Sequence, residues 1–246
     1  MTKRQRTAWE LIAVPRYFPI LINKGEEKLS STAEGFKRLA NLTKWIRYVL
    51  YAQILIATLS IIFSFLEYQL LIAYQAGVYA SLEAAFSGGE LAIQLLQSTG
   101  IASLIAFVAS AILILKWIYR ANYNVRQLGA QNLSYTPVWS IAYYFIPIFN
   151  LWKPYQAMKE IWLASKAPSA WSVSKISAVL PAWWALWLSS NILSQSIFRL
   201  SADAKELPEL MDLNMLSQIS NVLDILLAIV TLALVNGIFQ MQNSQQ

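Results

Sequence analysis

Asp224 is the only carboxylate that lies well inside a long apolar segment of the sequence. A charge at the centre of a membrane-spanning helix costs about 3 kcal/mol on insertion scales, so we expect this side chain to face the bundle interior, to be paired or to be protonated. Asn221 lies three residues earlier and therefore on the same helix face. The candidate intramembrane polar site consists of Asp224, Asn221, Asn191 and Ser110, which share a depth in the membrane.

Two interpretations of this polar site are open. It could bind an ion or a proton, or its side chains could form hydrogen bonds that fix the packing of neighbouring helices. We favour the packing role, because proton and ion pathways usually contain more than one ionisable group. In that case the Asp224 side chain would be hydrogen-bonded to neighbours such as Asn191 or Ser110.

A second group of polar residues surrounds a short apolar segment that contains Pro147. Such a cluster could bind a lipid headgroup or a partner protein. It could equally cap free backbone groups of the segment, since these groups need hydrogen-bond partners at membrane depth. The candidate inner-face cluster consists of Arg120, Asn122, Asn124, Arg126, Asn150 and Glu160.

The sequence lacks the residues and motifs that most enzyme mechanisms need. The absence of cysteine excludes disulfides, thiolate metal sites, iron–sulfur clusters and thiol catalysis. The absence of histidine removes the commonest general base and the usual haem ligand. The sequence also has no phosphate-binding loop, no dinucleotide-binding glycine motif and no nucleophile elbow. We therefore expect a protein that is not an enzyme and that has no cofactor and no metal.

Composition places these residues in an integral membrane protein. Of the 246 residues, 57% are hydrophobic and 13% are charged, whereas charged residues make up about 25% of ordinary soluble domains. The net charge is +6, and all Lys and Arg residues except Arg199 and Lys205 fall on segments that we assign to one side of the membrane. The positive-inside rule explains this distribution better than nucleic-acid binding does.

Four apolar segments are long enough to cross a bilayer as helices, which takes about 20 residues each. We expect spans at about 45–66, 101–119, 176–198 and 214–236. The connection between the first two spans contains three glutamates and no Lys or Arg, which assigns it to the outside and both termini to the cytoplasm. Pro181 is expected to kink the third span.

Residues 138–152 form an apolar segment that is too short to cross. The 15 residues are interrupted by Pro147, and positive charge on both sides, at Arg126 and Lys153, assigns both ends to the same side of the membrane. We therefore expect a re-entrant segment. The next helix, at 155–165, should lie in the inner interface with Lys153 and Glu160 facing water.

Three further expectations concern the inner ends of the spans. Trp117 and Tyr119 should belong to the aromatic belt at the inner surface. Gly129 should end the helix that follows the second span, because glycine readily adopts the left-handed conformation of a helix stop. The uncharged residues 237–246 should return to the cytoplasm as a tail.

Residues 1–44 are expected to form a cytoplasmic arm and lead-in helix, and residues 45–246 the membrane domain. The arm is basic, and its apolar stretch at 8–22 contains Glu10 and Arg16, so we interpret it as an interfacial arm rather than a signal peptide. A cytoplasmic tail is the alternative. Ser31 precedes Glu34 by three residues, a capping-box spacing that predicts a helix start near Thr32.

Three blocks of the sequence resemble a known family. They are residues 117–122, which read Trp-Ile-Tyr-Arg-Ala-Asn, then residues 137–165, with Pro147-Ile-Phe-Asn-Leu and Pro154 at their centre, and finally residues 183–187, which read Trp-Trp-Ala-Leu-Trp. Together they are similar to a bacterial multi-pass membrane family catalogued as domain of unknown function 4328. The resemblance covers roughly residues 101–236 and implies a bacterial inner-membrane protein of unassigned activity.

We therefore expect an all-α integral membrane protein with four transmembrane helices, a Pro-broken re-entrant segment and interfacial amphipathic helices. Its expected function is that of a non-catalytic scaffold or accessory subunit of the bacterial inner membrane. The alternative is a small channel or transporter that uses Asp224. The expected partners are the lipid bilayer, anionic lipid headgroups at the inner face, and a protein partner or a second copy of the chain. Nucleic acid is not expected.

Overall fold

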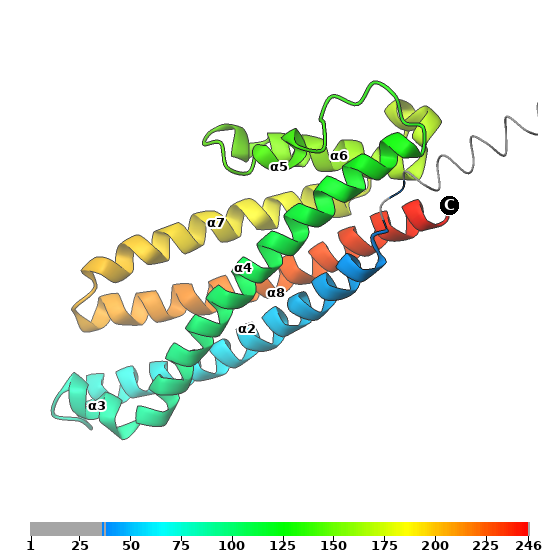
Figure 1. Cartoon of the computed structure of the whole chain (residues 1–246). Coiled ribbons are helices and arrows are strands. Elements are labelled where there is room, and N and C mark those ends of the chain that lie inside the picture. The colour runs from blue at the N-terminus through cyan, green and yellow to red at the C-terminus, as the bar shows by residue number, and fades with distance from the viewer. Residues whose placement is uncertain (1–35, 37, 246) are drawn as a thin grey trace, which may run out of the picture. The chain divides into compact units, whose positions relative to one another are not determined.

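The regular structure of the described residues is entirely helical (Figure 1). The computed structural model describes residue 36 and residues 38–245. The chain divides into two units, Met1–Phe36 and Lys37–Gln246, and the predictions for the arm at 8–22 and for a helix start near Thr32 lie outside the described residues. The helices are α2 (Ala40–Gln75), α3 (Leu82–Gly88), α4 (Glu90–Gln127), α5 (Trp139–Ala142), η2 (Phe149–Leu151), α6 (Lys153–Lys166), η3 (Pro168–Val173), α7 (Val179–Asp203) and α8 (Leu207–Asn243).

Three of these helices, α2, α4 and α8, are long and apolar enough to cross a membrane. Their most apolar stretches have mean hydropathies of 2.2, 2.3 and 2.4. They contain the predicted spans at 45–66, 101–119 and 214–236, so the chain is an all-helical multi-pass membrane protein. The predicted span at 176–198 corresponds to most of α7, which is long but falls short of the others in hydropathy, because serine, asparagine and glutamine are frequent in its second half.

Short connections and glycines determine where α2, α3 and α4 end. Gly77 has φ +77 and allows the chain to turn after α2. The Ser81 hydroxyl accepts a hydrogen bond from the backbone N–H of Ala84 and so caps α3. A Cβ at Gly89 would collide with the Leu70 side chain, so only glycine fits between α3 and α4 without a shift of that side chain.

The far end of α4 stops where the sequence predicted. Gly129 has φ +94, and the N–H of Ala130 donates to the carbonyl of Val125 at 3.0 Å. This six-to-one hydrogen bond around a left-handed glycine is the Schellman pattern of helix termination. The prediction that Gly129 ends the helix is confirmed.

The long helices of the second unit pack in an open row. Helix α2 packs against α4 on one side and α8 on the other, and α8 packs against α7. Helix α7 makes at most marginal contact with α2 and α4, so the row does not close into a ring at that side. Helix α6 contacts α4, α7 and α8 at one end of the row, above the N-terminal half of α7 (Figure 1).

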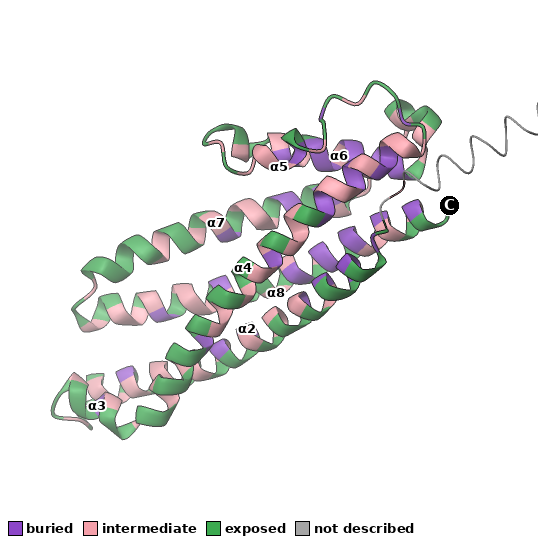
Figure 2. Cartoon of the chain, viewed as in Figure 1, coloured by how far each residue is buried: buried purple, intermediate pink, exposed green. Residues whose placement is uncertain are grey.

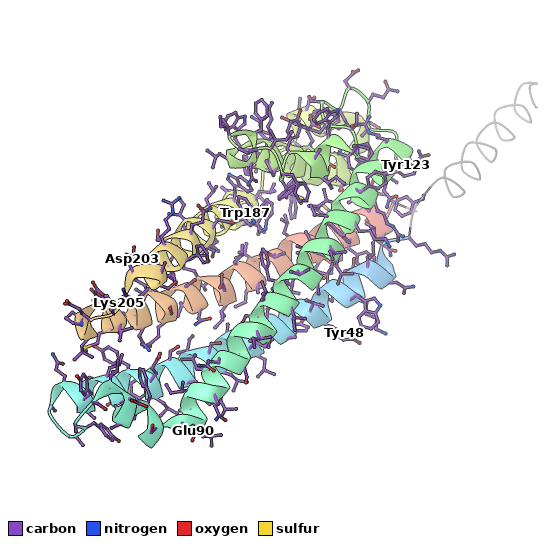
Figure 3. The ribbon with its side chains drawn as sticks, turned by 60° about the vertical axis from the view of Figure 1, so that its left-hand side comes forward. Tyr48, Glu90, Tyr123, Trp187, Asp203 and Lys205 are labelled. Carbon is purple, nitrogen blue, oxygen red and sulfur yellow. The ribbon has the colours of Figure 1, made fainter. Side chains whose placement is uncertain are left out.

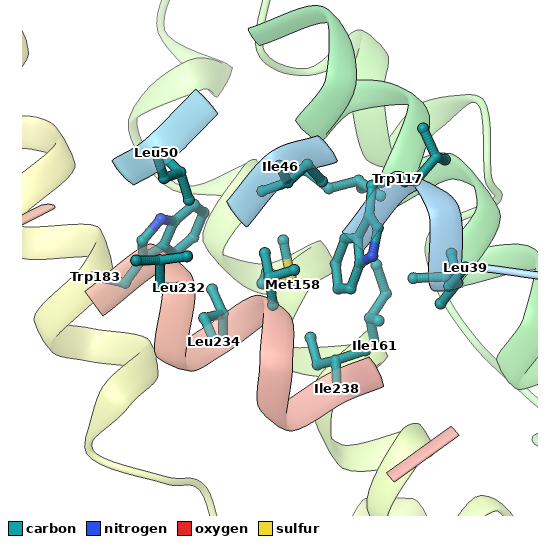
Figure 4. Close-up of a cluster of buried hydrophobic side chains, with 14 of the residues drawn as sticks. Leu39, Ile46, Leu50, Trp117, Met158, Ile161, Trp183, Leu232, Leu234 and Ile238 are labelled. Atoms are coloured by element: carbon teal, nitrogen blue, oxygen red, sulfur yellow. The ribbon is translucent and has the colours of Figure 1, made fainter. Parts of the chain in front are cut away.

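The hydrophobic core gathers at this α6 end. Figure 2 shows that buried residues concentrate there, whereas the opposite ends of the long helices are mostly exposed. In Figure 4 the side chains of Ile46, Trp117, Ile161 and Ile238 meet, and they come from α2, α4, α6 and α8. The many exposed apolar side chains elsewhere on the long helices suit contact with lipid rather than water.

Trp117 is part of this core and not of a lipid-facing belt, so our prediction for it was wrong. Its side chain is 0% exposed, and its indole N–H donates to the Thr43 hydroxyl at 3.0 Å. A tryptophan can be buried completely when its N–H finds a partner, and Thr43 of α2 supplies that partner. Tyr119, two residues further along α4, is only half-buried.

Two other expectations for helix ends need correction. Pro181 lies in the first turn of α7, which begins at Val179, and a proline there removes no hydrogen bond because first-turn N–H groups have no partner in the helix. It therefore need not kink the helix. Residues 237–243 are not a tail but the last turns of α8, in which Ile238 and Gln242 are buried.

We predict that Trp117→Phe and Thr43→Val each lower the free energy of unfolding by about 1–2 kcal/mol, because each removes a buried hydrogen bond. The double variant should lose about 1 kcal/mol less than the sum, since both changes remove the same bond. Unfolding in mixed detergent micelles measures these values. Trp45→Phe is the matched control, because Trp45 is 59% exposed. If the loss of unfolding free energy in the double variant equals the sum of the two single losses, the hydrogen bond between Trp117 and Thr43 contributes nothing to stability.

Candidate functional site

A buried amide ties three helices together at the α6 end. The Gln242 side chain of α8 donates to the Ala121 carbonyl of α4 at 3.1 Å and to the Ser165 hydroxyl of α6 at 2.8 Å. Its own carbonyl accepts a hydrogen bond from Asn124 at 3.2 Å. Gln242 is 1% exposed. The sequence analysis missed this residue because it assigned residues 237–246 to a tail.

Glu160 is buried and does not face water, which corrects our expectation for α6. Its carboxylate accepts hydrogen bonds from the backbone N–H groups of Ser134 and Tyr135, at 2.9 and 3.1 Å. On the other side of the same loop, Arg126 and Asn122 donate to the Tyr135 carbonyl, at 2.8 and 3.0 Å. The backbone of Tyr135 is therefore held from both sides by side chains of α4 and α6.

The predicted inner-face cluster is thus brought together only in part. Asn122, Arg126 and Glu160 converge on Tyr135, where they cap the backbone of the loop between α4 and α5. Asn124 bonds to Gln242 instead, and Arg120 donates to the Arg38 carbonyl at 3.3 Å. Asn150 lies in η2, and its side-chain oxygen is buried without a hydrogen-bond partner. Three of the six residues therefore bond to one loop, and the other three lie elsewhere and do not bond to it.

Residues 138–152 contain only the single turns α5 and η2, and they pack against the first half of α7. The Trp184 indole donates to the Leu151 carbonyl at 3.1 Å, and the Tyr144 and Trp187 rings meet edge to face at 6.1 Å. Ile148 has φ +70, which a β-branched residue rarely adopts. The segment is a compact hairpin-like element with an aromatic contact surface toward α7.

Lys153, at the start of α6, lies beside this segment. Its ammonium is 3.4 Å from the Tyr135 hydroxyl and 5.5 and 5.9 Å from the centroids of the Tyr135 and Tyr143 rings. The Tyr135 hydroxyl in turn donates to the side-chain carbonyl of Gln156. A cation held over aromatic faces is stabilised without a carboxylate.

The predicted intramembrane site does not assemble as a hydrogen-bonded group. Ser110 accepts a hydrogen bond from Gln53 of α2 at 3.2 Å and donates to the carbonyl of Phe107. Asn191 donates to the carbonyl of Trp187, at 2.7 Å, and thus within its own helix. Asn221 likewise donates within its own helix, to the carbonyl of Ser217 at 3.0 Å. None of these hydrogen bonds reaches Asp224.

Asp224 instead interacts with Ser190 of α7, one residue before the predicted Asn191. The Ser190 hydroxyl is buried and has no partner at normal hydrogen-bond geometry, so the two groups approach without forming a regular bond. The Asp224 side chain is exposed rather than enclosed. Asp224 thus has Ser190 as its polar neighbour in place of the expected Asn191 or Ser110.

Helices α2 and α8 are joined by two polar contacts that the sequence analysis did not identify. Near one end, Asn214 donates to the Ser64 carbonyl at 2.9 Å and to the Glu67 carboxylate at 2.7 Å. Near the other end, Arg47 donates to the side-chain carbonyl of Asn236 at 2.7 Å. The only signal in the sequence was the presence of amides inside an apolar helix, which is a frequent sign of interhelical hydrogen bonding.

A hollow of about 370 Å³ lies between α7 and α8 near their connection, away from the core. Asp203, Glu209 and Asp212 line it together with apolar residues. Glu209 precedes the apolar part of α8 and accepts hydrogen bonds from the backbone N–H groups of Lys205 and Glu206, which hold the pKa of its carboxyl below its usual range. Glu209 thus caps the start of α8. Within the described residues, no group of three or more His, Cys, Asp and Glu side chains could hold a metal ion.

Replacing Glu160 should release the loop at Tyr135. We predict that Glu160→Leu lowers the free energy of unfolding by about 2–4 kcal/mol, because it leaves two backbone N–H groups without a partner, and that Glu160→Gln has a smaller effect. Amide hydrogen exchange at Ser134 and Tyr135 should become faster in the leucine variant. Lys166→Leu, at an exposed position of the same helix, is the control. Unchanged exchange in Glu160→Leu would contradict the capping role.

Comparison with known proteins gives one match. The model of a protein family described as a domain of unknown function (DUF4328) matches residues 84–240. No curated protein and no solved structure gives a significant match. The matched range begins in α3 and ends in α8, so it includes the loop held by Glu160, the segment at 138–152 and Asp224.

Proposed function

This chain belongs to the family described as domain of unknown function DUF4328, and we propose that it is a non-catalytic scaffold or accessory subunit of the bacterial inner membrane. In this proposal α7 is a fourth transmembrane helix, residues 138–152 form a re-entrant segment, and both termini are cytoplasmic. Residues 1–44 are a basic arm, and residues 45–246 are the membrane domain.

The proposal that α7 crosses the membrane is supported by its length and its neighbour. Its 25 residues span about 37 Å as a helix, which exceeds the thickness of the hydrocarbon core. Residues 204–206 connect it directly to α8, and the two helices pack against each other. An antiparallel neighbour of a membrane-spanning helix occupies the same range of depths. The polar residues of α7 lower its hydropathy but do not shorten it.

The proposal of a re-entrant segment is supported by the contacts between residues 138–152 and α7. Tyr144 contacts Trp187, and Trp187 lies eight residues, or about 12 Å, along α7 from its first residue, Val179. The segment therefore extends alongside α7 instead of lying only across its end. It contains no helix long enough to cross.

One observation carries the proposal that the protein is a scaffold: many of the polar side chains described above bond to other groups of the same chain. Glu67 accepts from Asn214, Asn236 accepts from Arg47, and Glu160 holds a backbone loop. Groups used in this way fix the arrangement of helices and are not available to bind or activate a substrate. In this proposal, other molecules bind to the outer surface of the helix bundle.

Two separate parts of the chain are proposed to dock at the inner face, the basic arm by itself and α6 together with the linker after it. Lysines occur at 153, 159, 166 and 175, with aromatic residues between them. Lysine side chains near an inner membrane surface are attracted to anionic lipid headgroups by about 1 kcal/mol each. We therefore propose anionic lipid as one partner and a protein bound through residues 1–44 as another.

A small channel or transporter is the second candidate function. The observation in its favour is Asp224, a carboxylate that is exposed in the middle of α8. Intramembrane carboxylates often belong to ion or proton pathways. Against it, none of the hydrogen bonds formed by Ser110, Asn191 and Asn221 continues a pathway from Asp224.

The purified chain in lipid vesicles distinguishes the two functions. We predict that ion flux and proton-linked uptake stay at the level of empty vesicles, both for the natural chain and for Asp224→Asn. A partner that co-purifies with the full chain but not with a variant lacking residues 1–36, which keeps all of α2, would support the scaffold. A flux that Asp224→Asn abolishes, while the variant keeps its stability in detergent, would overturn it in favour of the transporter.

A further inference from the structure

We infer that the open side of the bundle at Asp224 is a docking site for a transmembrane helix of another protein, and that this helix carries a hydrogen-bond donor or a cation at mid-depth. The inference rests on the proposed accessory role and specifies how the partner is bound within the membrane. Its basis is the combination of an exposed carboxyl, an unpaired buried hydroxyl and an incomplete ring of helices.

Asp224 is exposed on a helix face that is otherwise buried. Ser220 and Ala228, four residues before and after it, and Thr231, three residues further on, lie on the same face of α8 and are all buried. Asp224 between them is exposed. At the level of Asp224 the other helices of the chain therefore cover this face only in part, and Ser190 of α7 is its neighbour there.

The arrangement of helices explains why that level is open. Helix α8 is covered by α2 on one side and by α7 on the other, but α4 and α7 make at most marginal contact across it. In Figure 1, α4 crosses obliquely over α2 and α8 while α7 follows α8, and α6 contacts both α4 and α7 only at one end (Figures 1 and 3). A single additional helix beside α7 would complete the packing around Asp224.

Ser190 adds an independent observation at the same place. Its side chain is 5% exposed, and its hydroxyl has no hydrogen-bond partner. Buried hydroxyls are normally paired, so an unpaired one beside an exposed carboxyl calls for an explanation. Because Ser190 lies beside Asp224, the two side chains form one polar spot between α7 and α8, which a donor on an added helix can reach at the exposed Asp224.

The chemistry of the site favours a helix with a donor over other occupants. Lipid acyl chains carry no donor and would leave the carboxyl unsatisfied. A hard cation such as Ca²⁺ takes six or more oxygen ligands, whereas one carboxyl and one hydroxyl meet here. A second copy of this chain related by a twofold axis would bring its own Asp224 to the same depth, and two facing carboxyls disfavour each other's charge.

The test uses a synthetic leucine-rich transmembrane peptide with one central lysine and a matched peptide with leucine at that position. The full chain has no cysteine, so a single cysteine at Ser244 can carry a fluorophore for energy transfer in zwitterionic vesicles. We expect the lysine peptide to associate about 3- to 30-fold more tightly than the leucine peptide, as interhelical hydrogen bonds in membranes allow. Asp224→Leu should abolish the difference, and Asp212→Leu should not.

Equal association of the two peptides with the natural chain would overturn the inference, as would a lysine preference that survives in Asp224→Leu. If the leucine variant does not fold, Asp224→Asn decides, because it keeps the shape of the side chain and should reduce the preference without a change in melting temperature. Rapid disulfide formation between copies of Asp224→Cys at low protein density would show that a second copy occupies the site and would also overturn it. If the vesicles show no flux and the lysine peptide binds no better than the leucine peptide, the docking site at Asp224 is ruled out, but the scaffold proposal still stands.

Discussion

A polar group that is buried away from water needs a hydrogen-bond partner within the protein, and this constraint shapes the contacts between the helices. Gln242 joins α8 to α4 and α6, Asn214 joins α8 to α2, and Glu160 secures the loop that follows α4. In lipid, apolar contacts do little to favour one helix neighbour over another, because the acyl chains are as apolar as the side chains. The hydrogen bonds therefore select the neighbours and the register of each helix.

These bonds and the apolar core coincide at one end of the bundle. Trp117 is buried there among residues of α2, α6 and α8, and its N–H bonds to Thr43. At the other end the long helices are covered mainly by the surrounding solvent or lipid (Figure 2). Asp224, in the middle of α8, lies between the packed end and the exposed end of the bundle.

The sequence predicted the helical class, the stop at Gly129 and four membrane-spanning helices, of which three have the length and hydropathy to cross, because these features depend on local hydropathy and backbone conformation. It did not predict that Glu160 and Trp117 are buried, because their partners, a loop backbone and Thr43, are distant in the chain. The position of Asp224 within a long apolar helix could be predicted, but its neighbour could not. Ser190 and Asn191 differ by about 100° around α7, and hydropathy does not determine which of them faces α8.

The central claim is that four helices cross the membrane while residues 138–152 return to the side from which they enter. Single cysteines tested with a membrane-impermeant thiol reagent measure this directly, since the chain has no other cysteine. Cysteines at Ser87 and Asp203 should react from outside, and cysteines at Gln131 and Ser169 should not. Labelling at Ser169 without labelling at Gln131 would show that the central segment crosses and would contradict the account.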